Sequence, residues 1–193
     1  MDKILKTLVK TGAILDGHFL LTSGLHSDKY VEKFRLIENP ESLNSVCSSM
    51  AETYKDKNID VVLGAAIGGI LIAGGVGKHL NVKHIFTERV NGIMELRRGF
   101  TIKKKERVVI VEDVITTGGS VFELIRLVEN HQGDIVRVIN LVDRSEEGID
   151  FGYPSTALLN LPSESWESET CPLCKVGKPI SERGRTGKKV GIV

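Results

Sequence analysis

The fold is decided by residues 107–120, which read RVVIVEDVITTGGS. The apolar run from Val108 to Val111 predicts a buried strand, and the small residues from Thr116 onward predict a turn that opens a helix. Two carboxylates, Glu112 and Asp113, stand at the junction between them. A strand that passes through a glycine-containing turn into a helix is typical of an α/β protein with a parallel sheet.

The same alternation continues on both sides of this stretch. We expect further strands at residues 60–64, 82–86 and 135–142, and helices at residues 41–57, 68–80 and 118–130. Short apolar strands separated by helices predict a parallel sheet with helices on both faces, the doubly wound α/β class. The chain is therefore expected to form a single domain over residues 1–193, with its core at residues 60–161.

The two ends of the chain and one internal segment depart from this rhythm. Residues 2–15 have helical spacing, and two β-prone runs follow at residues 18–22 and 29–34, around a polar turn. Residues 87–99 are charged and contain two glycines, which favours a flexible β-hairpin or lid over a helix. Residues 162–193 are polar and are expected to pack loosely as a tail.

Composition excludes several classes of partner. Lysine and arginine number 26 against 25 acidic residues, so the net charge of +1 gives no electrostatic reason to expect a nucleic acid or a membrane surface. The first ten residues are amphipathic, without a signal-peptide core, and no apolar stretch is long enough to span a bilayer. With only three cysteines, the chain is expected to be cytoplasmic.

The turn after the strand has the chemistry of a phosphate site. Backbone amides of residues 116–120 lie at a helix N-terminus, which attracts a phosphate, and Gly118 and Gly119 permit its close approach. Glu112 and Asp113 would repel that phosphate unless the ligand also carries hydroxyl groups or a metal ion. A ligand with a ribose diol at one end and a phosphate at the other suits both halves of the stretch.

This stretch resembles the phosphoribosyl-pyrophosphate signature of the type I phosphoribosyltransferases. The resemblance implies a parallel α/β core with a small N-terminal hood at residues 1–35. It also implies Mg²⁺ as cofactor, carried by the substrate, with no direct protein ligand assigned. The residues expected to bind phosphoribosyl pyrophosphate are Glu112, Asp113, Val114, Ile115, Thr116, Thr117, Gly118, Gly119 and Ser120.

Two further segments resemble the orotate branch of that family. Residues 19–30, FLLTSGLHSDKY, are similar to its hood segment, and residues 141–148, LVDRSEEG, present Arg144 in the place of the arginine used against orotate. A planar guanidinium suits a carboxylate, although a solvated arginine at a strand end is the alternative. Thr116 is a second expected contact to orotate. His26 is a candidate contact to a phosphate or the base, with a plain turn histidine as the alternative.

The chain also departs from the family pattern. The turn at residues 65–69 lacks the usual lysine, so that contacts to pyrophosphate there would come from backbone amides. Residues 87–99 contain no lysine either. Arg89 keeps the family's arginine after the strand, and we hypothesise that Arg97 or Arg98 replaces the missing lysine charge.

The resemblance implies the reaction. It is the transfer of ribose 5-phosphate from phosphoribosyl pyrophosphate to orotate, giving orotidine 5′-monophosphate and pyrophosphate, with Glu112, Asp113 and Arg89 as catalytic residues. A homodimer in which the lid of one subunit reaches its partner's site is also implied. The alternatives are the same chemistry on a purine base, or a regulator that binds the donor without catalysis.

Cys171 and Cys174 form half of a zinc pattern, with no second pair or histidine nearby in the sequence. Zinc would then require ligands from two subunits. We therefore expect a surface turn with two free thiols, while Cys47, on its predicted helix, is expected in the core.

Overall fold

The computed structural model describes residues 3–21, 24–54, 58–145, 147–162 and 164–181. The chain divides into two compact units, a larger one of residues 1–13 and 33–162 and a smaller one of residues 14–32 and 163–193. Parts of several predictions fall outside the described residues. These parts are Asp2 at the start of the first helix, Thr22 at the end of a strand, Ser23 at the start of the turn, residues 55–57 at the end of a helix, Glu146 beside Arg144, and residues 163 and 182–193 of the tail.

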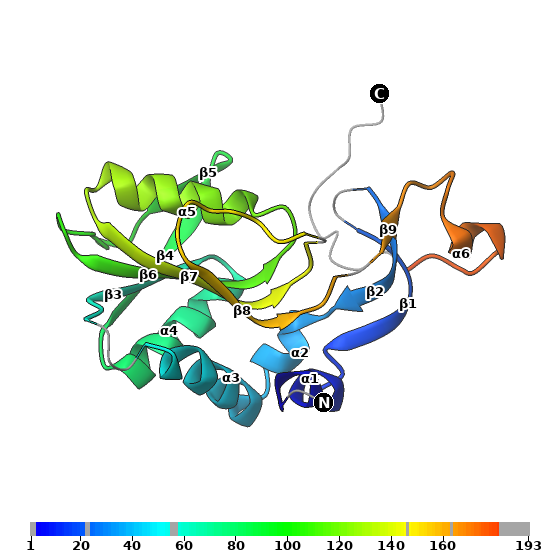
Figure 1. Cartoon of the computed structure of the whole chain (residues 1–193), viewed down its shortest axis with the longest axis horizontal. Helices are drawn as coiled ribbons and strands as arrows, with labels where there is room; N and C mark the ends of the chain where they lie inside the picture. The colour runs from blue at the N-terminus through cyan, green and yellow to red at the C-terminus, as the bar shows by residue number, and fades with distance from the viewer. Residues whose placement is uncertain (1–2, 22–23, 55–57, 146, 163, 182–193) are drawn as a thin grey trace. The chain divides into compact units, whose positions relative to one another are not determined.

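The larger unit contains a six-stranded sheet (Figure 1). Its strand order is β5-β4-β3-β6-β7-β8, and all neighbours are parallel except the antiparallel pair β4 and β5. The strands are β3 (Val61–Ala65), β4 (Lys83–Val90), β5 (Ile93–Leu96), β6 (Arg107–Ile115), β7 (Asp134–Asp143) and β8 (Ser155–Asn160). The β4–β5 hairpin turns at Asn91–Gly92, both with positive φ, and confirms the hairpin predicted for residues 87–99.

Helices cover both faces of this sheet, as predicted. In Figure 1, α3 and α4 lie on one face and α5 lies on the other. The helices of the larger unit are α1 (Lys3–Lys10), α2 (Lys33–Ile37), α3 (Pro40–Glu52), α4 (Gly68–Leu80) and α5 (Gly119–Asn130). The predicted α/β class with a parallel sheet is therefore confirmed, and no helix of the described residues is long and apolar enough to cross a bilayer.

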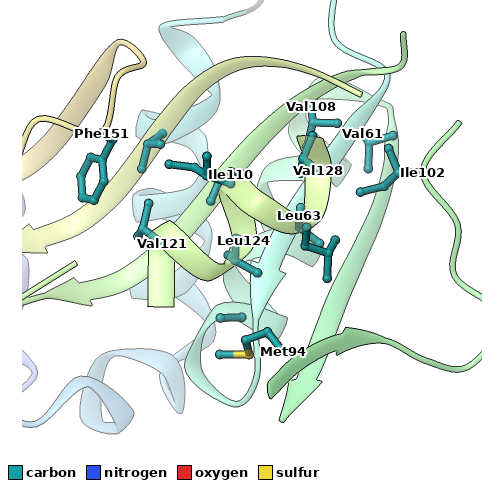
Figure 2. Close-up of a cluster of buried hydrophobic side chains, with 14 of the residues drawn as sticks. Val61, Leu63, Met94, Ile102, Val108, Ile110, Val121, Leu124, Val128 and Phe151 are labelled. Carbon is teal, nitrogen blue, oxygen red and sulfur yellow. The ribbon is translucent and has the colours of Figure 1, made fainter. Parts of the chain in front are cut away.

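The core of the larger unit lies between the sheet and α5. Figure 2 shows side chains of β3, such as Leu63, and of β6, such as Ile110, packed with Leu124 and Val128 of α5. All four are completely buried. Because β3 and β6 are covered on both faces, β3 and residues 108–111 of β6 are continuously apolar, and this packed core fixes the position of the strand ends that follow.

The smaller unit is built from two segments far apart in the sequence. Its sheet has the order β1-β2-β9, with both pairs antiparallel, and a short helix follows. Its elements are β1 (Ile14–Leu20), β2 (His26–Val31), β9 (Ser165–Trp166) and α6 (Pro172–Lys175). The expectation of a loosely packed tail is wrong for this part of the chain, because β9 pairs with β2 and Cys171 is fully buried.

The N-terminal predictions also need correction. The first helix ends at Lys10 and not at residue 15, because Gly12 adopts a φ of 68° and closes the helix by donating to Val9 O. Ile14 and Leu15, expected on that helix, begin β1. The second strand ends at Val31 and not at Phe34, since α2 begins at Lys33.

Candidate active site

The candidate site lies at the point in the sheet where the order of successive strands reverses. From β3 the chain proceeds to β4 on one side, whereas β6, on the other side of β3, is followed outward by β7 and β8. Between β3 and β6, the connections leaving the carboxyl ends of the two strands therefore run to opposite sides. Such a switch point opens a crevice in which parallel α/β proteins bind ligands.

The two predicted carboxylates lie inside β6 and not after it. The strand continues four residues past its predicted end at Val111, to Ile115. Glu112 and Asp113 are consequently only 7% and 3% exposed. Ile115 is also buried and packs in the apolar core, so only the backbone of that residue is available to a ligand.

Asp113 is held by a lysine that sequence reasoning missed. Lys33 Nζ, at the start of α2, lies 2.6 Å from Asp113 Oδ2, while Asp113 Oδ1 accepts a hydrogen bond of 2.5 Å from the Val114 amide. A single lysine eighty residues earlier carries no recognisable signal in the sequence. Because Asp113 is buried, this ion pair is shielded from solvent on one side and holds the carboxylate in a fixed orientation.

Gly68 lies directly against this carboxylate. It is the first residue of α4, and a Cβ added there would stand 1.5 Å from Asp113 Oδ2 and 3.2 Å from Lys33 Nζ. The preceding turn contains a cis peptide bond between Ala66 and Ile67. The absence of a side chain at Gly68 is therefore what lets the β3–α4 turn and the acidic strand end meet.

Glu112 occupies a different environment from its neighbour. Burial and the adjacent Asp113 carboxylate raise the pKa of Glu112 to about 8. In the parallel register, Glu112 is paired with Asn140 of β7, whose buried Nδ2 has no hydrogen-bond partner among the described residues. A protonated Glu112 can donate a hydrogen bond, so one acid of the pair is able to donate while the other accepts.

The raised pKa of Glu112 predicts how stability changes with pH. The folded protein retains a proton that the unfolded chain loses near pH 4.5, so the free energy of unfolding should fall as pH rises from 4.5 through about 8. Glu112→Gln cannot ionise and should lack this decline. We expect the variant to melt above wild type beyond about pH 8 and close to it at about pH 5. If the melting temperatures of wild type and variant changed with pH in the same way over this range, the pKa of Glu112 would not be raised.

The phosphate loop follows the acids. Thr116, Thr117 and Gly119 are exposed, and Gly118 is the N-cap of α5 with a φ of 74° and no side chain to cap the helix. The first amides of a helix have no partner within it, and here no capping side chain competes for them. The open N-terminus of α5 is therefore suited to an anion.

Arg144 lies beside the start of this loop. Its backbone N–H donates to Ile115 O at 2.9 Å, at the point where the last residues of β6 and β7, Ile115 and Asp143, pair in register. Ser145 turns the chain by donating its amide and hydroxyl to Asp143 Oδ1. The structure thus brings together the two residues predicted to contact the base, Thr116 and Arg144.

The remaining predicted arginines lie in the β4–β5 hairpin and the turn that follows it. Arg89 donates two hydrogen bonds to Glu123 of α5, at 2.8 and 3.1 Å, and a further one to Gly92 O. Arg98 pairs with Glu88 at 2.7 Å, while Arg97 is exposed. Arg89 would have to exchange Glu123 for a ligand before it could act on a leaving group.

His26 does not occupy a turn. It lies on β2 in the smaller unit, is buried, and contacts His18 and Cys174. Both readings of this histidine from the sequence, as a ligand contact and as a plain turn residue, place it in a turn and are wrong on that point. The reason is that β2 begins three residues earlier than the pattern predicts, which brings His26 into the sheet.

Comparison with known proteins agrees with this geometry. The phosphoribosyl transferase domain family matches residues 35–168. The orotate phosphoribosyltransferase of Caldicellulosiruptor bescii is 46% identical over 97% of this chain and 98% of its own length. That of Thermotoga maritima is 44% identical over 96% and 100%. The crystal structure of orotate phosphoribosyltransferase from Aeropyrum pernix superimposes with a TM-score of 0.70 at 27% identity, covering 90% of this chain and 98% of that one.

Proposed function

The chain belongs to the phosphoribosyltransferase family, in its orotate branch, and we propose that it transfers ribose 5-phosphate from phosphoribosyl pyrophosphate to orotate. The products are orotidine 5′-monophosphate and pyrophosphate. One observation carries the assignment of the site: a buried acidic pair, Glu112 and Asp113, stands directly before the open N-terminus of α5.

We propose that the loop binds the donor's 5′-phosphate. The amides of residues 116–119 and the hydroxyls of Thr116, Thr117 and Ser120 provide its hydrogen-bond donors. Because the loop follows a strand embedded in the core, the bound phosphate has a fixed position relative to the acids. This fixed position aligns the anomeric carbon for displacement.

Glu112 and Asp113 then bind the ribose hydroxyls. Asp113 accepts from one hydroxyl while Lys33 holds its other oxygen, and Glu112 accepts or donates according to its protonation. As the bond from the anomeric carbon to pyrophosphate breaks, positive charge develops on the ribose ring. The Asp113 carboxylate stabilises that charge, as does Glu112 when it is ionised, and the orotate ring nitrogen attacks from the opposite face.

Enzymes of this family generally use Mg²⁺ with the donor. Among the described residues, the acids of the site do not form a cluster of three possible metal ligands, and one oxygen of Asp113 is already paired with Lys33. These residues suit an ion that arrives bound to pyrophosphate and keeps other oxygen ligands. Such an ion would neutralise the charge of the departing pyrophosphate, and Glu112 and Asp113 would be the carboxylates available to it.

Arg144 is proposed to bind the carboxylate of orotate. Its position next to Thr116 supports this role. We expect Arg144→Ala to raise the KM for orotate by about 10- to 100-fold, as the loss of a charged hydrogen bond would, with little change in the KM for the donor. Steady-state assays by orotate absorbance measure both constants.

The control for this variant is Arg126→Ala, which removes an exposed arginine from α5. It should leave both constants unchanged. An unaltered KM for orotate in Arg144→Ala would overturn the assignment of this residue. The wild-type protein should also be offered adenine, xanthine and uracil. Turnover of a purine would favour the first alternative function, and donor binding without turnover of any base would favour a regulator.

Three finer points remain proposals. Arg89 is proposed to neutralise pyrophosphate after leaving Glu123, and Arg97 or Arg98 to supply the charge of the family's missing lysine. A homodimer is proposed because the resemblance to the family implies one. Its support is the exposed apolar pair Ile67 and Leu71 at the start of α4, which a partner subunit would cover. The cytoplasmic location stays a prediction.

A further inference from the structure

Four side chains that could hold a metal ion meet within the smaller unit. His18 comes from β1, His26 from β2, and Cys171 and Cys174 from the N-cap and third residue of α6. Their potential ligand atoms all lie within 4.8 Å of one another. The two histidines supply what the cysteine pair lacked in the sequence, and they come from the same chain.

The distances match the edges of a tetrahedral site. Zinc bound at about 2.0–2.1 Å to nitrogen and 2.3 Å to sulfur spaces its ligand atoms about 3.3 Å apart for two nitrogens and about 3.5 Å for nitrogen and sulfur. Here His18 Nε2 and His26 Nδ1 are 3.0 Å apart. The nitrogen–sulfur distances are 3.5 Å from His18 to Cys171, 3.8 Å from His18 to Cys174 and 3.3 Å from His26 to Cys174.

A backbone contact orients one of the ligands. His18 Nδ1 lies 2.7 Å from Lys178 O, and a carbonyl oxygen only accepts, so Nδ1 carries the proton. The lone pair of Nε2 is then directed at the other three side chains. A metal-bound histidine typically donates its second ring nitrogen to such a partner, which fixes its tautomer and its orientation.

Burial strengthens the case for a bound cation. His18, His26 and Cys171 are each at most 5% exposed, and Cys174 is partly exposed. Burying three polar side chains beside a fourth costs free energy unless their polar atoms have partners. A bound cation would be a partner for all four. All three cysteines of the chain are free thiols, so no disulfide satisfies this pair.

We propose that His18, His26, Cys171 and Cys174 bind a structural Zn²⁺ ion. A closed set of two imidazoles and two thiolates in tetrahedral arrangement is a typical structural zinc site, and no position is left for a substrate. The two thiols are free, as expected, but the expected surface turn is wrong for Cys171, which is fully buried. The two histidines come from the same chain, so the proposed site needs no second subunit.

The smaller unit has reason to need such an ion. Its buried apolar side chains, among the described residues, are Phe19, Val31 and Cys171. A unit with so small a core is stabilised by burial only weakly, and small units commonly depend on a metal or on disulfides. The ion would add a direct link between the β1–β2 hairpin and the C-terminal segment, beside the two-residue strand β9 and the backbone contacts at Ser181.

The first test uses the unaltered full-length chain, purified without chelator. Metal analysis should find about one zinc ion per chain, as expected of a single four-ligand site. Replacement by Co²⁺ should give the intense visible absorption of a tetrahedral site with thiolate ligands. Absence of zinc even after incubation with Zn²⁺, or a Co²⁺ spectrum of octahedral type, would overturn the proposal, and so would a Cys171–Cys174 disulfide found by mass spectrometry.

The second test compares matched cysteine variants. Cys174→Ser removes a partly exposed ligand, and we expect its zinc affinity to fall by at least ~100-fold in chelator competition. Cys47→Ser makes the same change on α3, in the larger unit, and should keep one zinc per chain. Equal zinc affinity in the two variants would contradict the proposal. The Co²⁺ measurement uses the unaltered chain, so it tests the proposed zinc site even if a variant fails to fold. Neither test depends on which base the enzyme accepts as substrate.

Discussion

Replacing Gly68 by alanine is expected to reduce kcat/KM by at least ~100-fold, the loss that a misplacement of about 1 Å at a reacting centre produces. The new methyl group would stand 1.5 Å from Asp113 Oδ2 and 2.7 Å from Asp113 Cγ, so the carboxylate must move. It is buried, and moving it also disturbs its ion pair with Lys33. Overpacking of this kind should also cost about 1–3 kcal/mol of stability. Steady-state kinetics and chemical denaturation measure the two effects.

Gly74→Ala is the matched control on the same helix. The nearest atom to its added methyl group is His84 Cδ2 at 3.8 Å, an ordinary contact. Alanine favours a helix interior over glycine by up to about 1 kcal/mol, so this variant should be as stable as wild type or more so, with unchanged kinetics. Normal turnover by Gly68→Ala would mean that the placement of Asp113 is not needed for the reaction.

Asp113→Asn is expected to lower kcat by about 10²- to 10³-fold, the loss typical of removing one group that stabilises charge in a transition state. Asparagine keeps the size of the side chain but removes its negative charge, and it leaves Lys33 without its carboxylate partner. Because the proposed role is exerted as positive charge develops on ribose, kcat should fall more than the KM values rise. Separate measurement of kcat and of both KM values tests this.

The matched control is Asp16→Asn, which makes the same change in an exposed ion pair with Lys29. Pairs of this kind contribute roughly 0–1 kcal/mol, so neither kinetics nor stability should change much. A variant at Asp113 that keeps its kcat but loses donor affinity would assign this residue to binding alone.

Local sequence patterns predict much of the larger unit. Helix α4 has the predicted bounds, Gly68–Leu80, because an apolar pattern, glycines at the start and Asn81 in a left-handed conformation at the end all favour the same helix. The end of β6 is predicted less well. Hydrophobic patterning ends the strand before Glu112, since two carboxylates rarely occur inside a buried strand.

Contacts between distant residues explain the rest of what sequence reasoning missed. Lys33 reaches Asp113 only because the fold brings α2 to the end of β6, and no local pattern reports that contact. The histidine–cysteine cluster is missed for the same reason, since His18 and Cys171 are separated by 153 residues. Metal-site patterns rely on short spacings between ligand pairs, whereas here two lone histidines complete a single cysteine pair.

The smaller sheet combines strands from two distant parts of the chain, and this determines when it can fold. Strands β1 and β2 are synthesised early, but β9, their partner in the sheet, emerges from the ribosome only after the whole of residues 33–162. Until then, the edge of β2 that β9 later covers carries unpaired backbone groups, and His18 and His26 lack the two cysteines. The larger unit can complete its own core during this interval. The smaller unit is therefore the last part of the nascent chain to become native.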